Sequence, residues 1–322
     1  MTTMPAPSSA TGPAAAGAHS QMSGPRPPRR TDPHVTAGVR NKLRRRHVVN
    51  GIMVGLVALA ALLATLPLLF ILFHLLALGG SSLQLHFFTN LPKPVGEEGG
   101  GMANAIIGTV IIVGVASAIG LPVGIGAGLY LAEHSATRLA RATRFLADVL
   151  NGLPSIVMGI FAWEVLVRPV GHFSGWAGSV ALAAMMVPQV ARTTEEIVRT
   201  VPVSLREAAL ALGYSHWRTS LSIVLRTASA GVVTGALVAI ARIAGETAPL
   251  LFTAFGNQFW STSINRPMAA LPLQIYNYAI SPYDDWHAQA WAGSLVLIGM
   301  ILFISLVARF ATRGRFAGTG GD

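Results

Sequence analysis

Two charged residues, Arg242 and Glu246, lie inside a long apolar stretch that runs from about residue 221 to 255. On a helix, side chains four positions apart share one face. Ionisable groups within a membrane span are costly and mark either a pathway or a pair. The planar guanidinium of Arg242 suits oxyanions, because it donates two bonds at once. One interpretation is that Arg242 neutralises an anion in a pathway while Glu246 holds or releases it. The other is a salt bridge that only fixes helix packing.

Three further residues are candidates for the same pathway. Arg226 lies 16 positions before Arg242, roughly 24 Å along a helix, and is either a second anion contact or an anchor at the cytoplasmic mouth. Pro154 interrupts another apolar stretch, and Ser155 beside it offers a local partner to the disrupted backbone. Such a break either lines a substrate path or is a packing kink.

The sequence contains none of the common catalytic or nucleotide-binding motifs. The P-loop pattern Gly-x4-Gly-Lys-Ser/Thr, the zinc-protease pattern His-Glu-x-x-His and the nucleophile pattern Gly-x-Ser-x-Gly are all absent. The histidines show no ligand-like pairing, and the lack of cysteine excludes disulfides and thiolate chemistry. We therefore expect that the chain on its own is not an enzyme and binds neither a metal nor a cofactor.

The composition is that of an integral membrane protein. Of the 322 residues, 52% are hydrophobic and only 11% are charged, whereas about a quarter of the residues of a soluble domain are charged. The net charge of +10 does not indicate nucleic-acid binding, because the basic residues lie at the ends of apolar runs rather than in a patch among aromatic residues.

Six apolar runs are candidates to cross the bilayer, which takes roughly 20 residues for a core of about 30 Å. They cover about residues 48–76, 103–132, 142–167 (interrupted at Pro154), 175–190, 221–255 and 291–310. We expect an all-α membrane protein with six transmembrane helices. Residues 1–46 form a disordered basic tail in this prediction, 47–312 the transmembrane domain, and 313–322 a short C-terminal tail.

The distribution of basic residues predicts the orientation. Of the 23 Lys and Arg residues, 19 lie in the N-terminal tail, the segments 133–144 and 192–226, and the C-terminal end. Only Lys93, Arg168 and Arg266 lie on the other side. By the positive-inside rule, both termini are cytoplasmic, and so is the segment 192–226.

That cytoplasmic segment is predicted to contain a short amphipathic helix over about residues 203–214. Ser204 and Glu207 have the spacing of a capping box, and Gly213 can take the left-handed conformation that ends a helix. One face is apolar and comprises Leu205, Ala208, Ala209 and Leu212. At roughly 15 Å the helix is too short to span a bilayer. It is either a docking surface or an interfacial helix that lies on the lipid.

The order Glu207-Ala208-Ala209, then Gly213, then Ile223-x-Leu225 resembles the EAA signature of ATP-binding cassette (ABC) importer permeases. In that family this segment is the coupling helix, which sits in a cleft of the cytoplasmic ATPase. The resemblance implies that Glu207, Ala208, Ala209 and Gly213 couple the chain to an ATPase. The family usually has a proline after the leucine; here Arg226 stands in its place, which predicts an uninterrupted helix into the next span.

Residues 239–254, 257–262 and 153–157 narrow the resemblance to the phosphate-specific permeases of the Pst system, PstA type. The similarity covers about residues 48–312. It implies a type I ABC importer permease of the plasma (inner) membrane that transports inorganic phosphate. It also implies a heterodimer with a related PstC-type permease, an ATPase dimer that carries ATP and Mg²⁺, and an extracytoplasmic phosphate-binding protein. Arg242 and Glu246, and with them Arg226, are then expected to be transport residues.

Two other functions stay open at this stage. The first is an ABC permease for another oxyanion, such as sulfate or molybdate, because only the Arg242 region argues for phosphate. The second is a self-contained secondary anion transporter, which would work without an ATPase. Such transporters often contain internal repeats, and no obvious repeat relates the two halves of this sequence.

Overall fold

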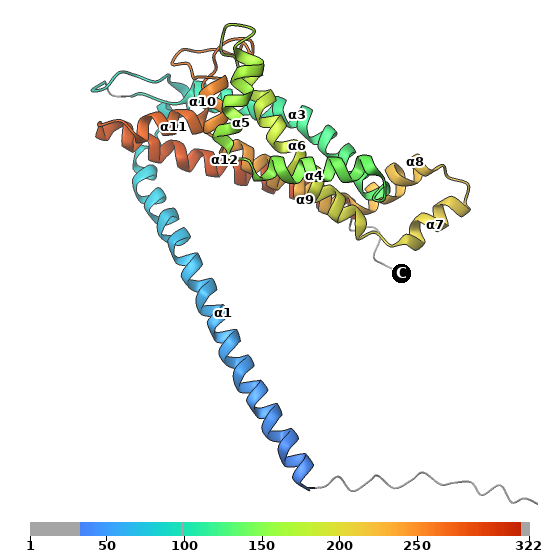
Figure 1. Ribbon diagram of the computed structural model, residues 1–322. Helices are drawn as coiled ribbons and strands as arrows, with labels where there is room; N and C mark the ends of the chain where they lie inside the picture. The colour runs from blue at the N-terminus through green and yellow to red at the C-terminus, as the bar shows by residue number, and fades with distance from the viewer. Residues whose placement is uncertain (1–32, 98, 317–322) are drawn as a thin grey trace, which may run out of the picture. The chain divides into compact units, whose positions relative to one another are not determined.

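The structure is a computed structural model that describes residues 33–97 and 99–316, with side chains over 42–97 and 99–310. The regular secondary structure of the described residues is helical, and an isolated bridge joins Phe255 and Met268 (Figure 1). The chain forms two units, residues 1–66 and residues 67–322. The expected all-α architecture therefore holds for the described part of the chain.

The first unit contains the N-terminal part of helix α1 (Pro33–Ser82). From residue 48 to 66 its side chains are almost all apolar and are exposed on every side of the helix. A helix that is apolar all round is typical of a membrane span, and Lys42–Ser82 is long and apolar enough to be one. Residues 33–46 of the predicted tail are helical, and residues 1–32 lie outside the described residues.

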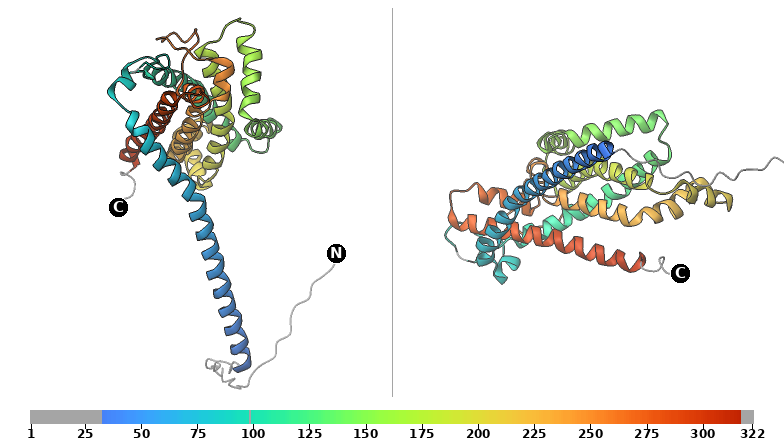
Figure 2. Two further views of the ribbon diagram at one scale, coloured as in Figure 1. Left: turned by 90° about the vertical axis from the view of Figure 1, so that its left-hand side faces the viewer. Right: turned by 90° about the horizontal axis from the view of Figure 1, so that it is seen from below.

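The second unit is a bundle of long helices, packed side by side in both views of Figure 2. Helix α3 (Ala103–Glu133) packs along α6 (Gly175–Arg199), and α6 in turn packs against α9 (Leu225–Ala244). The C-terminal helix α12 (Asp284–Phe316) packs against α9 and against the short helix α11 (Leu271–Ala279). A second short helix, α2 (Leu85–Thr89), contacts α3.

Glycines set the close approach of α3 and α6. A Cβ atom at Gly120 would lie 2.9 Å from the sulfur of Met186, and one at Gly124 would lie 2.7 Å from the Cβ of Val190. At Gly128 a Cβ would lie 2.5 Å from a backbone oxygen of α6. Small residues at four-residue intervals let membrane helices approach until their backbones nearly touch. The glycine-rich sequence of this span is therefore a packing surface.

The predicted third span is not one kinked helix but two helices. Helix α4 (Arg138–Gly152) ends before Pro154, and α5 (Ser155–Ala162), which continues as a π-helical turn over Trp163–Val167, leaves at 105°. Leu153 is extended, with φ −73° and ψ 136°. The reason is steric, because a proline ring disfavours helical dihedrals at the residue before it.

The predicted fifth span also divides. A continuous helix runs over His216–Ala244 through α8 (His216–Arg218), a π-helical turn (Thr219–Val224) and α9. This confirms that no break follows Leu225. The chain then turns at 245–247 into α10 (Ala248–Thr253), so the expected helix to residue 255 is wrong in its last third. Pro249, in the first turn of α10, suits a helix start rather than a helix interior.

Four helices of the described chain are long and apolar enough to cross a membrane: Lys42–Ser82, Ala103–Glu133, His216–Ala244 and Asp284–Phe310. The bent pair Arg138–Gly152 and Ser155–Val167 makes a fifth if it counts as one span. Helix α6, which contains the predicted fourth span, is not among them. Its last third is charged, with Arg192, Glu195, Glu196 and Arg199.

Candidate functional site

The predicted amphipathic helix is α7 (Val203–Ala211), which lies with α8 at one end of the second unit (Figure 1). Gly213 follows it with a φ of 84°. The Gly213 N–H donates to the Leu210 carbonyl at 2.9 Å, and the Tyr214 N–H donates to the Ala209 carbonyl at 3.1 Å. These are the two bonds of a Schellman motif. The prediction that Gly213 ends the helix in a left-handed conformation is confirmed.

The predicted capping box at the start of this helix is wrong. Helix α7 begins at Val203, with Pro202 as its N-cap and no side-chain hydrogen bond to the cap. Ser204 is therefore the second residue of the helix and not its N-cap, so Ser204 and Glu207 do not occupy the N-cap and N3 positions that a capping box requires. Glu207 is exposed, which leaves its carboxylate available to another protein.

Most of the predicted apolar face of α7 is uncovered. Ala209 is buried, but Ala208 is exposed and Leu212 keeps 79% of its surface. The exposed large apolar residues on and just after α7 are Val203, Leu205, Leu212, Tyr214 and Trp217. We call these five residues the α7 patch. A contiguous exposed apolar patch is typical of a surface that another molecule covers.

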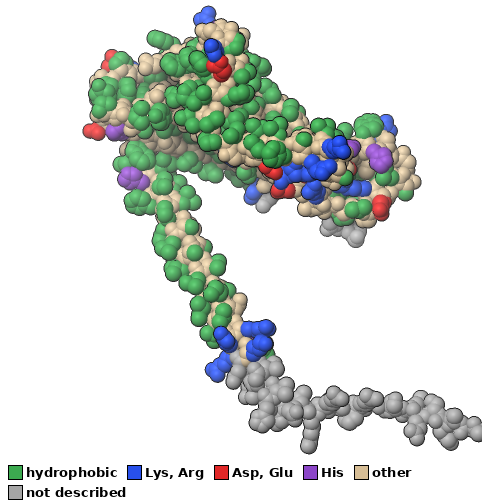
Figure 3. All heavy atoms as spheres, in the orientation of Figure 1, with side chains coloured by type: hydrophobic (Ala, Val, Ile, Leu, Met, Phe, Trp, Pro, Cys, Tyr) green, Lys and Arg blue, Asp and Glu red, His purple; other side chains and the backbone are tan. Residues whose placement is uncertain are grey.

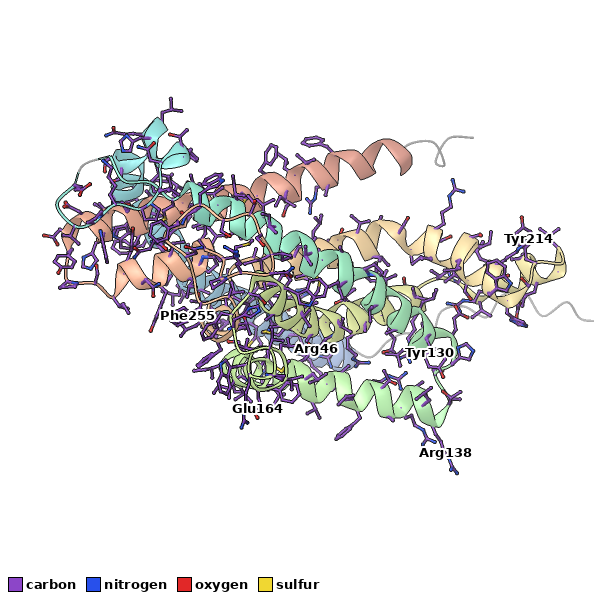
Figure 4. The ribbon with its side chains drawn as sticks, turned by 90° about the horizontal axis from the view of Figure 1, so that it is seen from above. Arg46, Tyr130, Arg138, Glu164, Tyr214 and Phe255 are labelled. Carbon is purple, nitrogen blue, oxygen red and sulfur yellow. The ribbon has the colours of Figure 1, made fainter. Side chains whose placement is uncertain are left out.

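The end of the second unit that carries α7 is also strongly basic. In Figure 4, Tyr130 and Arg138 lie toward the same end as Tyr214, while Phe255 lies away from it. Lys and Arg side chains gather over this end in Figure 3. The structure therefore groups the α7 patch with basic residues of the segments 133–144 and 192–226, which the sequence predicts to be cytoplasmic.

A buried carboxylate, Glu195 of α6, organises the arginines near this end. The Glu195 side chain is fully buried. Its carboxylate oxygens form ion pairs with guanidinium nitrogens of Arg144 of α4 at 2.6 Å, Arg192 at 2.6 Å and Arg199 at 2.7 Å. Arg192 also contacts Asp148 of α4 at 2.9 Å. These five residues are the Glu195 cluster. It joins α4 to α6.

Burial alone would raise the pKa of the Glu195 carboxyl. The hydrogen bonds from Arg144 and Arg192, together with the charge of Arg199, outweigh burial and hold that pKa below its usual value. Glu195 is therefore ionised at neutral pH. Our sequence reading missed this cluster because it treated residues 192–226 as a loop. The signal was the spacing of Arg192, Glu195 and Arg199, which places them on one face if the helix continues.

Arg242 and Glu246 come together only loosely. Arg242 lies in the last turn of α9, but Glu246 follows the helix end, so the prediction that they share a helix face is wrong. Their closest charged atoms, Nε and Oε1, are 3.9 Å apart, beyond the range of a hydrogen bond. The Arg242 side chain keeps 52% of its surface exposed, against 19% for Glu246. This geometry leaves the guanidinium free to meet another anion.

The remaining predicted pathway residues fall into two places. Pro154 is the N-cap of α5, and Ser155 starts the helix; the Ser155 hydroxyl has no hydrogen bond within the described residues, so it is not the predicted partner of the broken backbone. A Cβ at Gly159 of α5 would lie 3.0 Å from the Ala248 carbonyl. The break thus packs close to the turn that holds Glu246. Arg226 is exposed near the opposite end of α9.

An open groove of about 550 Å³ runs between α6 and α9. Small and hydroxyl-bearing residues dominate its lining, which comprises Thr193, Ile197, Ala230, Gly231, Thr234, Gly235 and Val238. On α9 these positions fall between Arg226 and Arg242. The two glycines let α6 and α9 approach closely at the bottom of the groove, because a Cβ at Gly235 would lie 2.5 Å from Thr193.

Comparison with known proteins identifies the family. Residues 124–315 match the family model described as "Binding-protein-dependent transport system inner membrane component". The chain is 49% identical over 240 residues to the phosphate transport system permease protein PstA of Yersinia pestis, which covers 74% of this chain and 81% of the relative. It is 45% identical over 261 residues to PstA of Haemophilus influenzae, with 81% and 92% covered.

Solved structures support the fold. A chain of the MetNI methionine ABC transporter in an inward-facing conformation matches with a TM-score of 0.56 at 18% identity, over 66% of this chain and 95% of that one. At that identity the likeness concerns the fold alone. It agrees with the helical architecture described above. The chain therefore belongs to the binding-protein-dependent transport system inner membrane components and, among them, to the PstA-type permeases.

Proposed function

We propose that this chain is the membrane-spanning permease subunit of an ATP-driven importer of inorganic phosphate. The observation that carries the proposal is the combination of PstA-type relatives, named for phosphate transport, with a short helix, α7, whose apolar residues are exposed at the basic end of the bundle. A permease that works through a separate ATPase needs such a surface, whereas a self-contained transporter does not.

The proposed topology has six transmembrane segments and cytoplasmic termini. To the four long apolar helices it adds the bent pair α4 and α5 as the third span and the first two thirds of α6 as the fourth. The bias of 19 basic residues against 3 supports this orientation. It also puts α7 and the Glu195 cluster on the cytoplasmic side, where ATP is available.

In this proposal α7 docks in a cleft of a cytoplasmic ATPase dimer. The α7 patch supplies apolar contact area, and the exposed carboxylate of Glu207 supplies a charged contact. Gly213 fixes the conformation of the C-terminal end of α7. ATP and Mg²⁺ belong to the ATPase. The permease contributes movement and no catalytic group, in keeping with the absence of nucleotide-binding motifs from its sequence.

The proposed pathway follows the exposed face of α9. Arg242 contacts the phosphate oxyanion, and Glu246 holds or releases it. The groove between α6 and α9 leads toward Arg226 at the cytoplasmic mouth. The break at Pro154 and Ser155 packs beside this region and gives α5 freedom to move. A related permease of PstC type supplies the other wall, and an extracytoplasmic binding protein delivers phosphate. Alternating access then follows ATP binding and hydrolysis.

The decisive experiment measures uptake of labelled phosphate into proteoliposomes that contain this chain, the partner permease and the ATPase. The binding protein is outside, ATP is inside, and unlabelled sulfate is the competitor. The proposal predicts uptake that requires ATP and ignores sulfate. Uptake without ATP would instead identify a secondary carrier, and ATP-dependent uptake that sulfate blocks would identify a different oxyanion importer.

A further inference from the structure

Arg206 is the one charged side chain of α7 that points back into the bundle within the described structure. Its Nη1 atom lies 2.6 Å from Oε1 of Glu133, the last residue of α3. Its Nη2 atom donates to the carbonyl of Val198, near the end of α6, at 3.1 Å. One guanidinium therefore joins α7 to the ends of two long helices.

The environment of this contact differs from that of a surface ion pair. The side chains of Arg206 and Glu133 keep only 20% and 22% of their surfaces exposed. The Nε–H of Arg206 is buried and has no partner within the described residues. A buried donor without a partner costs free energy, and such groups in native structures call for an explanation. The guanidinium of Arg206 is planar, so its two hydrogen bonds to Glu133 and Val198 also fix the orientation of the side chain.

Apart from this contact, α7 packs mainly against the π-helical turn Thr219–Val224, which leads into α9 and not into α3 or α6. Among the residues of α7 itself only Ala209 is buried, and the exposed α7 patch faces away from the chain. The connection from α6 passes through Thr200, Val201 and Pro202, and the return passes through the turn at Gly213. Without Arg206, a movement of α7 would reach α9 through the packing on Thr219–Val224, but it would reach the ends of α3 and α6 only indirectly.

We propose that Arg206 is the tether through which movement of α7 is transmitted to α3 and α6. The tether rests on the proposed function, because it gives the coupling helix its mechanical connection to the transmembrane bundle. With Arg206 in place, α7 and the ends of α3 and α6 move as one body. Without it, α7 still docks on the ATPase, but its displacement reaches α9 and is no longer passed directly to the ends of α3 and α6.

The first test measures uncoupling. Arg206→Met and Glu133→Gln each remove one side of the ion pair at nearly constant volume. We expect the ATPase to copurify at wild-type levels and to hydrolyse ATP at its wild-type rate, while phosphate uptake per ATP falls about tenfold, a typical coupling effect. Arg206→Lys keeps the charge but not the fork, and should fall between Met and wild type. Arg138→Met and Glu196→Gln, two exposed residues, are the matched controls.

Normal uptake per ATP in Arg206→Met and Glu133→Gln would overturn the tether. So would parallel loss of uptake and copurified ATPase, because that result would make Arg206 a docking or folding residue. A double-mutant cycle adds a third check: if the two residues act through one contact, the double variant Arg206→Met/Glu133→Gln should be no worse than either single variant.

The second test does not depend on the transported solute. The chain has no cysteine, so two spin labels can be placed at Ala211→Cys on α7 and Gly126→Cys on α3. Ala211 is exposed, and a Cβ at Gly126 meets nothing within 4 Å. We expect a narrow interlabel distance distribution that is unchanged when the ATPase binds ATP, and a broad one in Arg206→Met. A distance that shifts with ATP in the wild type would overturn the tether. Failure of phosphate uptake in the wild type would overturn only the proposed function.

Discussion

The left-handed turn at Gly213 allows the proposed coupling role of α7 to be tested quantitatively. A Cβ at this position would meet nothing within 4 Å, so a substitution here introduces backbone strain without a steric clash. The φ of 84° costs an ordinary L-residue roughly 1–2 kcal/mol. For Gly213→Ala, part of this cost is offset by about 0.4–1 kcal/mol from the less flexible unfolded chain. The net destabilisation of the α7 end is then about 1 kcal/mol.

If docking requires the ordered Schellman motif, about 1 kcal/mol weakens ATPase binding about fivefold. The expected order of affinities is wild type, then Gly213→Asn, then Gly213→Ala, then Gly213→Val. Asn tolerates the left-handed region best and a β-branched residue tolerates it least. The assay titrates purified ATPase onto the permease heterodimer in lipid nanodiscs and follows complex formation by fluorescence anisotropy, with membrane insertion checked separately.

Gly126→Ala is the matched control for this series. It is also an exposed glycine with open space around its Cβ position, but it lies inside α3 with helical dihedrals. Alanine there should leave ATPase binding unchanged and favour the helix by up to about 1 kcal/mol. Equal ATPase affinity across the Gly213 series would refute the reasoning that the left-handed turn orders the docking surface. An order set by side-chain volume instead of backbone preference would refute the claim that the site has open space.

Three other predictions follow from the same geometry. Arg242→Ala should abolish phosphate uptake by a complex that assembles and hydrolyses ATP, with Arg242→Lys intermediate; normal uptake would reduce the Arg242–Glu246 pair to a packing contact. Gly128→Ala should lower the free energy of unfolding of the permease by about 1–3 kcal/mol, because its Cβ would lie 2.5 Å from the Ala191 carbonyl oxygen; a thermal melt that matches Gly126→Ala would contradict this. Single cysteines placed at Ala211 and at Ser263 should react with a membrane-impermeant maleimide from the cytoplasmic and the external side respectively, and labelling of both from one side would exclude the proposed orientation.

Much of the local structure was predictable from the sequence. The apolar runs 48–76, 103–132 and 291–310 lie inside helices of the structure, because an apolar run of that length has few alternatives to a helix in a membrane. Gly213 ends α7 as expected, since the preference of glycine for positive φ is local.

The candidate site was predictable only in part. The sequence located Arg242, Glu246 and the α7 segment, because charges within apolar stretches and short amphipathic stretches stand out from their surroundings. It did not reveal that the helix stops at Ala244 or that α4 and α5 meet at 105°. Both errors arose where one apolar run contains two helices, because periodicity alone does not distinguish a break from a kink.

Sequence by itself determined that this is a helical membrane protein with clustered basic residues, a short helix that ends at Gly213 and an arginine within a long apolar stretch. These properties depend on composition and on short-range spacing, which the unfolded chain already carries. Only the tertiary structure decided that Arg144 pairs with Glu195, 51 positions away, and that Arg206 pairs with Glu133, 73 positions away. Such pairs form because helix packing, set here by the glycines of α3, brings distant segments together and excludes water from between them. Buried charges then require partners, and the packing determines which partners are within reach.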